Sequence, residues 1–70
     1  MGSPMQLTVN GETVNAPEAT ALSALLADWG IDPTKVAIER NLEIVPRSLY
    51  GETVLADGDV LEVVEFVGGG

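Results

Sequence analysis

The chain has 70 residues with no cysteine and no histidine, and eleven acidic residues against three basic ones leave a net charge of −8. A chain this short forms one domain with one hydrophobic core, and without cysteine neither disulfides nor thiolate metal sites can reinforce it. The negative charge opposes nucleic-acid binding and suits a basic protein partner, although it also serves to keep a small domain soluble.

Neither a membrane segment nor a secretion signal is visible in the sequence. No apolar run approaches the roughly 20 residues that span a bilayer. No basic segment followed by an apolar stretch marks a signal peptide. We therefore expect a soluble, cytoplasmic protein that has no membrane partner.

The N-terminal part of the chain predicts a β-hairpin. Two short segments with strand character, at 6–9 and 12–15, flank Asn10 and Gly11. This residue pair favours a type I′ turn, because both central positions of that turn need a positive φ. The first two strands are therefore expected to pair antiparallel.

An apolar stripe at helical spacing predicts one helix over residues 21–29. Thr20 is the expected N-cap of this helix. Gly30 is the expected left-handed residue at its end, and Pro33 prevents the helix from resuming. A helix with one apolar stripe must cover a sheet, and the stripe consists of Leu22, Leu25, Leu26 and Trp29.

Two strands are predicted after the helix, at 35–40 and 43–45. Residues 48–51 then cross the surface as a turn or a short 3₁₀ segment. A short extended segment follows at 53–55.

The last strand is predicted over residues 60–67, after a turn formed by Asp57, Gly58 and Asp59. Both of its faces carry apolar side chains, which favours a position inside the sheet over an edge with one wet face. Alternation of side chains places Leu61 and Val63 on one face, and Val60, Glu62, Val64 and Phe66 on the other.

Three glycines, Gly68, Gly69 and Gly70, follow this strand directly. Because glycine has no Cβ atom, such a tail can enter a narrow channel that any side chain would block. Fully extended, it carries a carboxylate roughly 10 Å beyond Val67, at about 3.3–3.6 Å per residue. A frayed terminus explains the glycines, taken alone, equally well.

The residue inventory opposes direct catalysis. Without histidine and cysteine the chain lacks the usual base near neutral pH, the usual thiol nucleophile and the commonest soft metal ligands. Of the two carboxylate pairs, Asp57 and Asp59 form a turn signature, and Glu62 and Glu65 lie on opposite strand faces. We expect no catalytic residue and no metal site, and the carboxylate of Gly70 is the best candidate for a reactive group.

The element order β-β-α-β-β-β, with the last strand inside the sheet, predicts an α+β fold of the β-grasp (ubiquitin-like) type. This is a mixed sheet of about five strands with one main helix packed on one face. We assign the domain to residues 5–67 and a flexible tail to 68–70, and we interpret residues 1–4 as a cloning remnant. The expected core consists of Leu7, Val9, Leu22, Leu25, Leu26, Val36, Ile38, Leu61 and Val63.

Nearly the whole chain from Met5 onward resembles the ThiS family, the ubiquitin-like sulfur carrier proteins of thiazole synthesis in thiamin biosynthesis. The segments that carry the resemblance are VNGE at 9–12, VAIERNLEIVPR at 36–47, DGD at 57–59 and FVGGG at 66–70. Together these segments are specific, whereas a terminal Gly-Gly is not.

The resemblance implies a carrier that is the substrate of its partner enzymes and binds no cofactor itself. In this family an adenylating ThiF-like enzyme uses ATP and Mg²⁺ to convert the terminal carboxylate, here that of Gly70, to an acyl adenylate. Sulfur from a donor such as a cysteine desulfurase displaces AMP and leaves a thiocarboxylate, which a ThiG-like thiazole synthase uses. Gly69 is the residue that passes through the enzyme's channel, with Gly68 as an additional glycine.

Val64 and Phe66 are the expected docking residues for these partner enzymes. Ordering three tail residues in a channel costs roughly 1–2 kcal/mol each in backbone entropy, so a contact with the body of the carrier must assist. Exposed apolar side chains beside the tail supply such a contact. Coverage of this face by a loop is the alternative, and the free chain is expected to be a monomer.

Three other functions fit parts of the same pattern. A MoaD-like sulfur carrier of molybdopterin synthesis shares the fold and the Gly-Gly end, but those chains are usually longer and have Pro-Pro before the tail. A ubiquitin-like protein modifier uses the same adenylation and then forms isopeptide bonds. A non-covalent interaction domain uses no adenylation at all.

Overall fold

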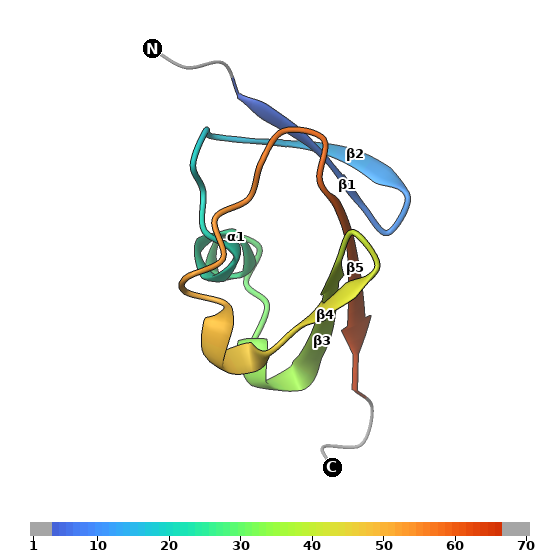
Figure 1. The fold of residues 1–70 in the computed structure, drawn as a ribbon. Helices are drawn as coiled ribbons and strands as arrows, with labels where there is room; N and C mark the ends of the chain where they lie inside the picture. The colour runs from blue at the N-terminus through green and yellow to red at the C-terminus, as the bar shows by residue number, and fades with distance from the viewer. Residues whose placement is uncertain (1–3, 67–70) are drawn as a thin grey trace.

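The computed structural model describes residues 4–66, and these form a five-stranded sheet with one α-helix across one face (Figure 1). The order of strands in the sheet is β2-β1-β5-β3-β4. The strands are β1 (Met5–Val9), β2 (Glu12–Ala16), β3 (Val36–Arg40), β4 (Glu43–Val45) and β5 (Val60–Glu65), the helix is α1 (Leu22–Asp28), and short 3₁₀ turns lie at Pro33–Lys35 and Arg47–Leu49.

Two hairpins with two-residue turns build the sides of the sheet. β1 pairs antiparallel with β2, and β3 pairs antiparallel with β4. Asn10 and Gly11 have φ of 50° and 83°, which confirms the predicted turn with two left-handed residues. Asn41 and Leu42 repeat this backbone conformation in the second hairpin, with φ of 52° and 73°.

The last strand lies in the middle of the sheet, as predicted. β5 pairs parallel with β1 on one side and antiparallel with β3 on the other, where the register joins Val36 to Glu65 and Arg40 to Leu61. A parallel pair needs a crossover connection, and the chain between β1 and β5 supplies it by crossing the sheet with α1 (Figure 1). The α+β, β-grasp fold predicted from the element order is confirmed.

The start of α1 differs from the prediction. Thr20 is not the N-cap: Ala21 occupies that position without a side-chain hydrogen bond, and the Thr20 hydroxyl donates to the carbonyl of Pro17 at 2.6 Å. Distant backbone provides the missing acceptors, because Leu22 N–H donates to the Thr53 carbonyl at 2.8 Å and Ser23 N–H donates to the Tyr50 carbonyl at 3.0 Å. The helix start needs no capping side chain when these carbonyls satisfy its free N–H groups.

The extended segment predicted at 53–55 joins no strand of the sheet. It forms one isolated bridge, between Val54 and Ala21. Its polar backbone groups bond to the entrance of α1 instead, since Leu55 N–H donates to the carbonyl of Thr20 at 3.0 Å.

The end of α1 is a Schellman motif. Gly30 has a φ of 71° and its N–H donates to the Ala27 carbonyl at 3.1 Å, while Ile31 N–H donates to the Leu26 carbonyl at 2.9 Å. Ile31 is partly buried against the core, as the apolar residue of this motif usually is. The predicted role of Gly30 is confirmed.

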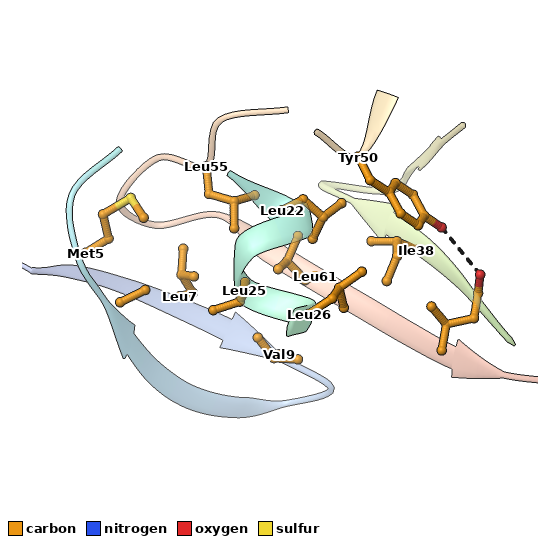
Figure 2. Packing of buried hydrophobic residues seen from close by; sticks show 12 residues of the cluster. Met5, Leu7, Val9, Leu22, Leu25, Leu26, Ile38, Tyr50, Leu55 and Leu61 are labelled. Carbon is orange, nitrogen blue, oxygen red and sulfur yellow. Dashed lines mark hydrogen bonds between the residues drawn. The ribbon is translucent and has the colours of Figure 1, made fainter. Parts of the chain in front are cut away.

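The core lies between α1 and the sheet, and it contains the residues expected from the sequence. Figure 2 shows Leu22, Leu25 and Leu26 of α1 among side chains of the sheet. Of the predicted set, Val63 alone is half-buried, and the structure adds Met5, Ala16, Tyr50 and Leu55 to the core.

Tyr50 corrects the prediction that residues 48–51 only cross the surface. Its side chain is 4% exposed, and its hydroxyl donates to the Val36 carbonyl at 3.4 Å (Figure 2). A buried tyrosine needs such an acceptor, because an unpaired hydroxyl in an apolar environment is costly.

Candidate functional site

β5 is the element that leads the chain to its predicted functional end. Beyond it, Phe66 N–H still donates to the Lys35 carbonyl at 2.9 Å, so backbone pairing continues to the last described residue. The predicted tail residues Gly68, Gly69 and Gly70 lie outside the described residues. The structure therefore shows how the base of the tail is held.

Asn10 holds β5 from the side of β1. Its side-chain carbonyl accepts from Val63 N–H at 2.8 Å, and its side-chain amide donates to the Val63 carbonyl at 3.2 Å. The side chain thus pairs with β5 as a peptide group of another strand would. Asparagine suits this position for two reasons: its side chain can form these two hydrogen bonds, and its backbone tolerates the positive φ of the turn.

Asn41 holds β5 from the side of β3 with one side-chain bond and one backbone bond. Its side-chain carbonyl accepts from Val60 N–H at 3.0 Å, and its backbone N–H donates to the Val60 carbonyl at 2.8 Å. Its side-chain amide donates to Asp59 Oδ1 at 3.1 Å. The first residue of each hairpin turn is therefore an asparagine that fixes the central strand.

Asp59 anchors the start of β5 through a network of hydrogen bonds. Its side chain is nearly buried, and its carboxylate accepts from Arg40 Nε at 2.8 Å and from Ala56 N–H at 2.9 Å. Burial acts to raise the pKa of Asp59, but hydrogen bonds from Ala56, Asn41 and Arg40 outweigh it and hold the pKa below its usual value. Arg40 and Asp59 form the one ion pair among residues 4–66.

The face of the sheet opposite α1 carries the predicted docking residues. Leu61 on the helix side of β5 is fully buried, whereas Val64 is 56% exposed and Phe66 is 51% exposed. Ala37 lies directly opposite Val64 on β3 and is half-buried. No described loop covers Val64 and Phe66, although their binding role stays a prediction.

Two exposed apolar residues near this face were not singled out in the sequence. Ile44 is 74% exposed and lies opposite Glu39, and Leu42 is 89% exposed at the tip of the hairpin. Alternation with half-buried Val45 was the signal that could have identified Ile44. Leu42 could have been identified because it follows an asparagine in a predicted two-residue turn, at a position where glycine is the usual residue.

Residues 4–66 offer little that could perform chemistry directly. In this part of the chain no group of three or more acidic, histidine or cysteine side chains is placed to hold a metal ion. No helix in it has the length and apolar character needed to cross a bilayer. What these residues do provide is a central strand, β5, that is hydrogen-bonded on both sides, up to Val63 on the side of β1 and up to Phe66 on the side of β3. Exposed apolar side chains lie at the end of this strand.

The fold and this site define a ubiquitin-like β-grasp domain in which the last strand is also the central one, so that residues 67–70 follow the middle of the sheet. The model of the ThiS family matches residues 1–70. Sulfur carrier protein ThiS of Bacillus subtilis is 42% identical over 65 residues, which cover 91% of this chain and 98% of that protein. The crystal structure of a thiamine biosynthesis protein (ThiS) from Geobacter metallireducens superposes with a TM-score of 0.79 at 35% identity, and the match covers 94% of this chain and all of that one.

A second kind of relative is much longer. A thiazole synthase of Paramagnetospirillum magneticum is 52% identical over 66 residues, which cover 94% of this chain and 20% of that protein. This chain therefore spans about a fifth of the length of that relative. The chain belongs to the ThiS family, and the resemblance found in its sequence is confirmed.

Proposed function

We propose that this chain is a sulfur carrier protein of thiamin biosynthesis, and that sulfur is carried as a thiocarboxylate on Gly70. The observation that supports this most is the match of the ThiS family along the entire chain, including the glycines that follow β5. The rigid attachment of β5 by Asn10 and Asn41 suits the role, because a short tail reaches a fixed depth in a partner only from a fixed base.

The chemistry that we propose takes place on the tail and uses groups of the partner enzyme. An α-carboxyl group has a pKa of about 3.3–3.7 and is ionised near pH 7. An oxygen of the Gly70 carboxylate attacks the α-phosphorus of ATP and displaces pyrophosphate, once Mg²⁺ and the activating enzyme stabilise the developing charge. The terminal sulfur of a persulfide on the donor then attacks the acyl carbon and displaces AMP, which leaves an acyl disulfide. A thiol reductant cleaves the S–S bond of this disulfide and releases the thiocarboxylate, so the carrier is a substrate in every step.

We propose three protein partners: an adenylating enzyme, a sulfur donor such as a cysteine desulfurase, and thiazole synthase. The thiazole synthase of Paramagnetospirillum magneticum supports the last of these, because a segment similar to this chain makes up about a fifth of that protein. Adenylation requires ATP, so we place the reaction in the cytoplasm. Val64 and Phe66, both exposed beside the tail, are the proposed docking residues.

The experiment that tests this function extends the chain by one residue. An added alanine moves the carboxylate about 3.3–3.6 Å beyond its aligned position and places a side chain at the reaction centre. Purified carrier, ATP, Mg²⁺, a sulfur donor, a thiol reductant and the activating enzyme are incubated, and intact mass is recorded. We expect the 70-residue chain to gain the mass of one sulfur and lose that of one oxygen, and the extended chain to remain unmodified.

A second variant and a fold control complete this test. Gly69→Val is expected to block the reaction as well, because a β-branched residue restricts the backbone and widens the tail. Circular dichroism spectra of both variants should match the parent, since neither change touches the described domain. Equally fast modification of the extended chain, with no protease present to trim it, would overturn the proposal.

A further inference from the structure

Leu42 has a backbone conformation that its side chain disfavours. Its φ is 73°, in the left-handed region, where a bulky residue is an outlier because its Cβ atom crowds the following carbonyl. The β1–β2 hairpin provides a comparison within the same molecule, because both residues of its turn also have positive φ and the second of them is a glycine, Gly11. Leucine at the corresponding place therefore destabilises the hairpin relative to glycine or asparagine.

The side chain of Leu42 gains no compensating burial in the folded chain. It is 89% exposed, the largest exposed fraction among the large apolar residues described, and Ile44 beside it is 74% exposed. Strained residues that persist without a local benefit are a feature of functional sites. The strain and the exposure are independent observations, and both indicate that the benefit lies in contact with another molecule.

The surroundings of this tip are acidic. Glu43 follows Leu42 and is exposed, and Glu39 lies directly opposite Glu62 in the register of β3 and β5. Two like charges that face one another on neighbouring strands destabilise the sheet, and a positively charged group of a partner would relieve their repulsion. The nearest basic side chain in the register, that of Arg40, is already engaged by Asp59 at 2.8 Å.

Leu42 and Phe66, the last described residue, lie near opposite ends of β5 and are within reach of one partner. Asn41 is hydrogen-bonded to Val60 at the beginning of β5, and Phe66 directly follows the last residue of this strand. Six strand residues span roughly 20 Å at about 3.3 Å each. A standard interface of about 800 Å² per partner is roughly 28 Å across, so one protein can hold the tail and cover the hairpin tip together.

We propose that Leu42, together with Ile44, anchors the carrier in an apolar pocket of thiazole synthase, and that basic side chains of the synthase at the rim of this pocket meet Glu39 and Glu62. This inference rests on the proposed sulfur-carrier function. Thiazole synthase is the chosen occupant because a segment similar to this chain is part of the thiazole synthase of Paramagnetospirillum magneticum. The net charge of −8 suits basic side chains on that partner.

The test compares three variants at the strained position in binding to purified thiazole synthase from the same organism. Leu42→Asn removes the apolar anchor and tolerates positive φ, so it should weaken binding about tenfold or more while leaving the melting temperature of the free carrier equal or higher. Leu42→Gly should weaken binding similarly. Leu42→Met retains an apolar side chain and should bind within about twofold of the parent.

The acidic part of the surface is tested separately. Glu62→Gln should weaken binding about threefold or more at low salt and lose most of that effect at high salt, because exposed charge pairs are screened. Glu18→Gln removes the same charge from the exposed connection before α1 and should bind like the parent. Equal weakening by both substitutions would show that net charge, and not this face, attracts the synthase.

Mass spectrometry separates failure of this inference from failure of the carrier function. Each variant is first incubated to completion with the activating enzyme and the sulfur donor, and thiocarboxylate on Gly70 is recorded. A parent chain that forms no thiocarboxylate would refute the function. If the parent forms the thiocarboxylate and the Leu42→Asn variant binds thiazole synthase as tightly as the parent does, the proposal that Leu42 anchors the carrier is wrong.

Discussion

Individual polar side chains determine where the tail-bearing strand begins and how it is held. Asn10 and Asn41 satisfy the backbone of β5 from its two sides, and Asp59 joins its first residues to Arg40. The asparagine contacts supply hydrogen bonds to the backbone of β5 at positions where its two short neighbouring strands do not reach. A domain of this size has a small stability margin, so each such contact matters to the position of the whole strand.

We expect Asp59→Asn to lower the free energy of unfolding by about 1–3 kcal/mol, because it leaves the Arg40 guanidinium without its ion-pair partner and weakens the bond to Ala56 N–H. Urea unfolding at neutral pH, followed by circular dichroism, measures this difference. A variant as stable as the parent would show that the network positions β5 without stabilising it.

The pH dependence of the stability difference between the parent and Asp59→Asn tests whether the Asp59 carboxylate is ionised in the folded chain. The pKa of Asp59 is lowered from its ordinary value of 3.8 in the folded chain, so the unfolded chain binds more protons in acid. The stability that this group contributes is therefore present above the unfolded pKa and is lost as the pH falls through the folded one. The difference between parent and Asp59→Asn should shrink below about pH 4, whereas a difference constant down to about pH 2 would contradict the assignment.

The helix α1 depends on the sheet for its existence. It has seven residues, and isolated helices shorter than about 12–15 residues are marginal in water. Its stability comes from burying Leu22, Leu25 and Leu26 against the sheet, and from carbonyls of Tyr50 and Thr53 that accept its first N–H groups. The segment after the second 3₁₀ turn thus completes the helix as well as the core.

Leu26→Ala should reduce the free energy of unfolding by about 2–5 kcal/mol, since the side chain is 1% exposed and its removal leaves a cavity between α1 and the sheet. Thermal melts measure the effect. Ala27→Ser, one residue further on the exposed side of α1, is the matched control and should melt within a few degrees of the parent. Indistinguishable melts for Leu26→Ala and the parent would mean that the helix buries another face.

The molecule as a whole has two unlike sides. One side of the sheet is closed by α1 and the connection that follows the second 3₁₀ turn, as Figure 1 shows. The other side is open and carries exposed apolar residues on β4 and β5 with two facing glutamates between them. A layered fold of this size needs one core only, so the second face of the sheet is free to bind partners.

Phe66→Asp should leave the melting temperature nearly unchanged and weaken binding of the activating enzyme about tenfold or more, because the side chain is 51% exposed and contributes little to the core. Calorimetry of binding and a thermal melt of the free carrier are the two measurements. Ala24→Asp adds the same charge on the exposed side of α1 and should bind normally. A large loss of stability in Phe66→Asp would indicate that this residue belongs to the fold and not to a docking surface.

Short-range patterns in the sequence were sufficient to predict much of the secondary structure and the exposure of several side chains. The turn at Asn10 and Gly11, the apolar stripe of α1 and its end at Gly30 all depend on residues within a few positions of one another. The alternation that exposes Val64 and Phe66 is equally local, and so their exposure was predicted correctly, while their docking role stays a prediction. The family resemblance added the proposed role of the tail, which no physical pattern in the chain specifies.

Contacts between distant segments could not be obtained in that way. Thr20 is the expected cap by local rules, yet carbonyls about thirty residues further along the chain, at Tyr50 and Thr53, satisfy the helix start instead. The burial of Tyr50 and the apposition of Glu39 and Glu62 likewise require knowing which segments lie side by side. Backbone carbonyls are the same at every residue, and strand neighbours are set by the packing of the entire sheet, so these features arise only when the chain has folded.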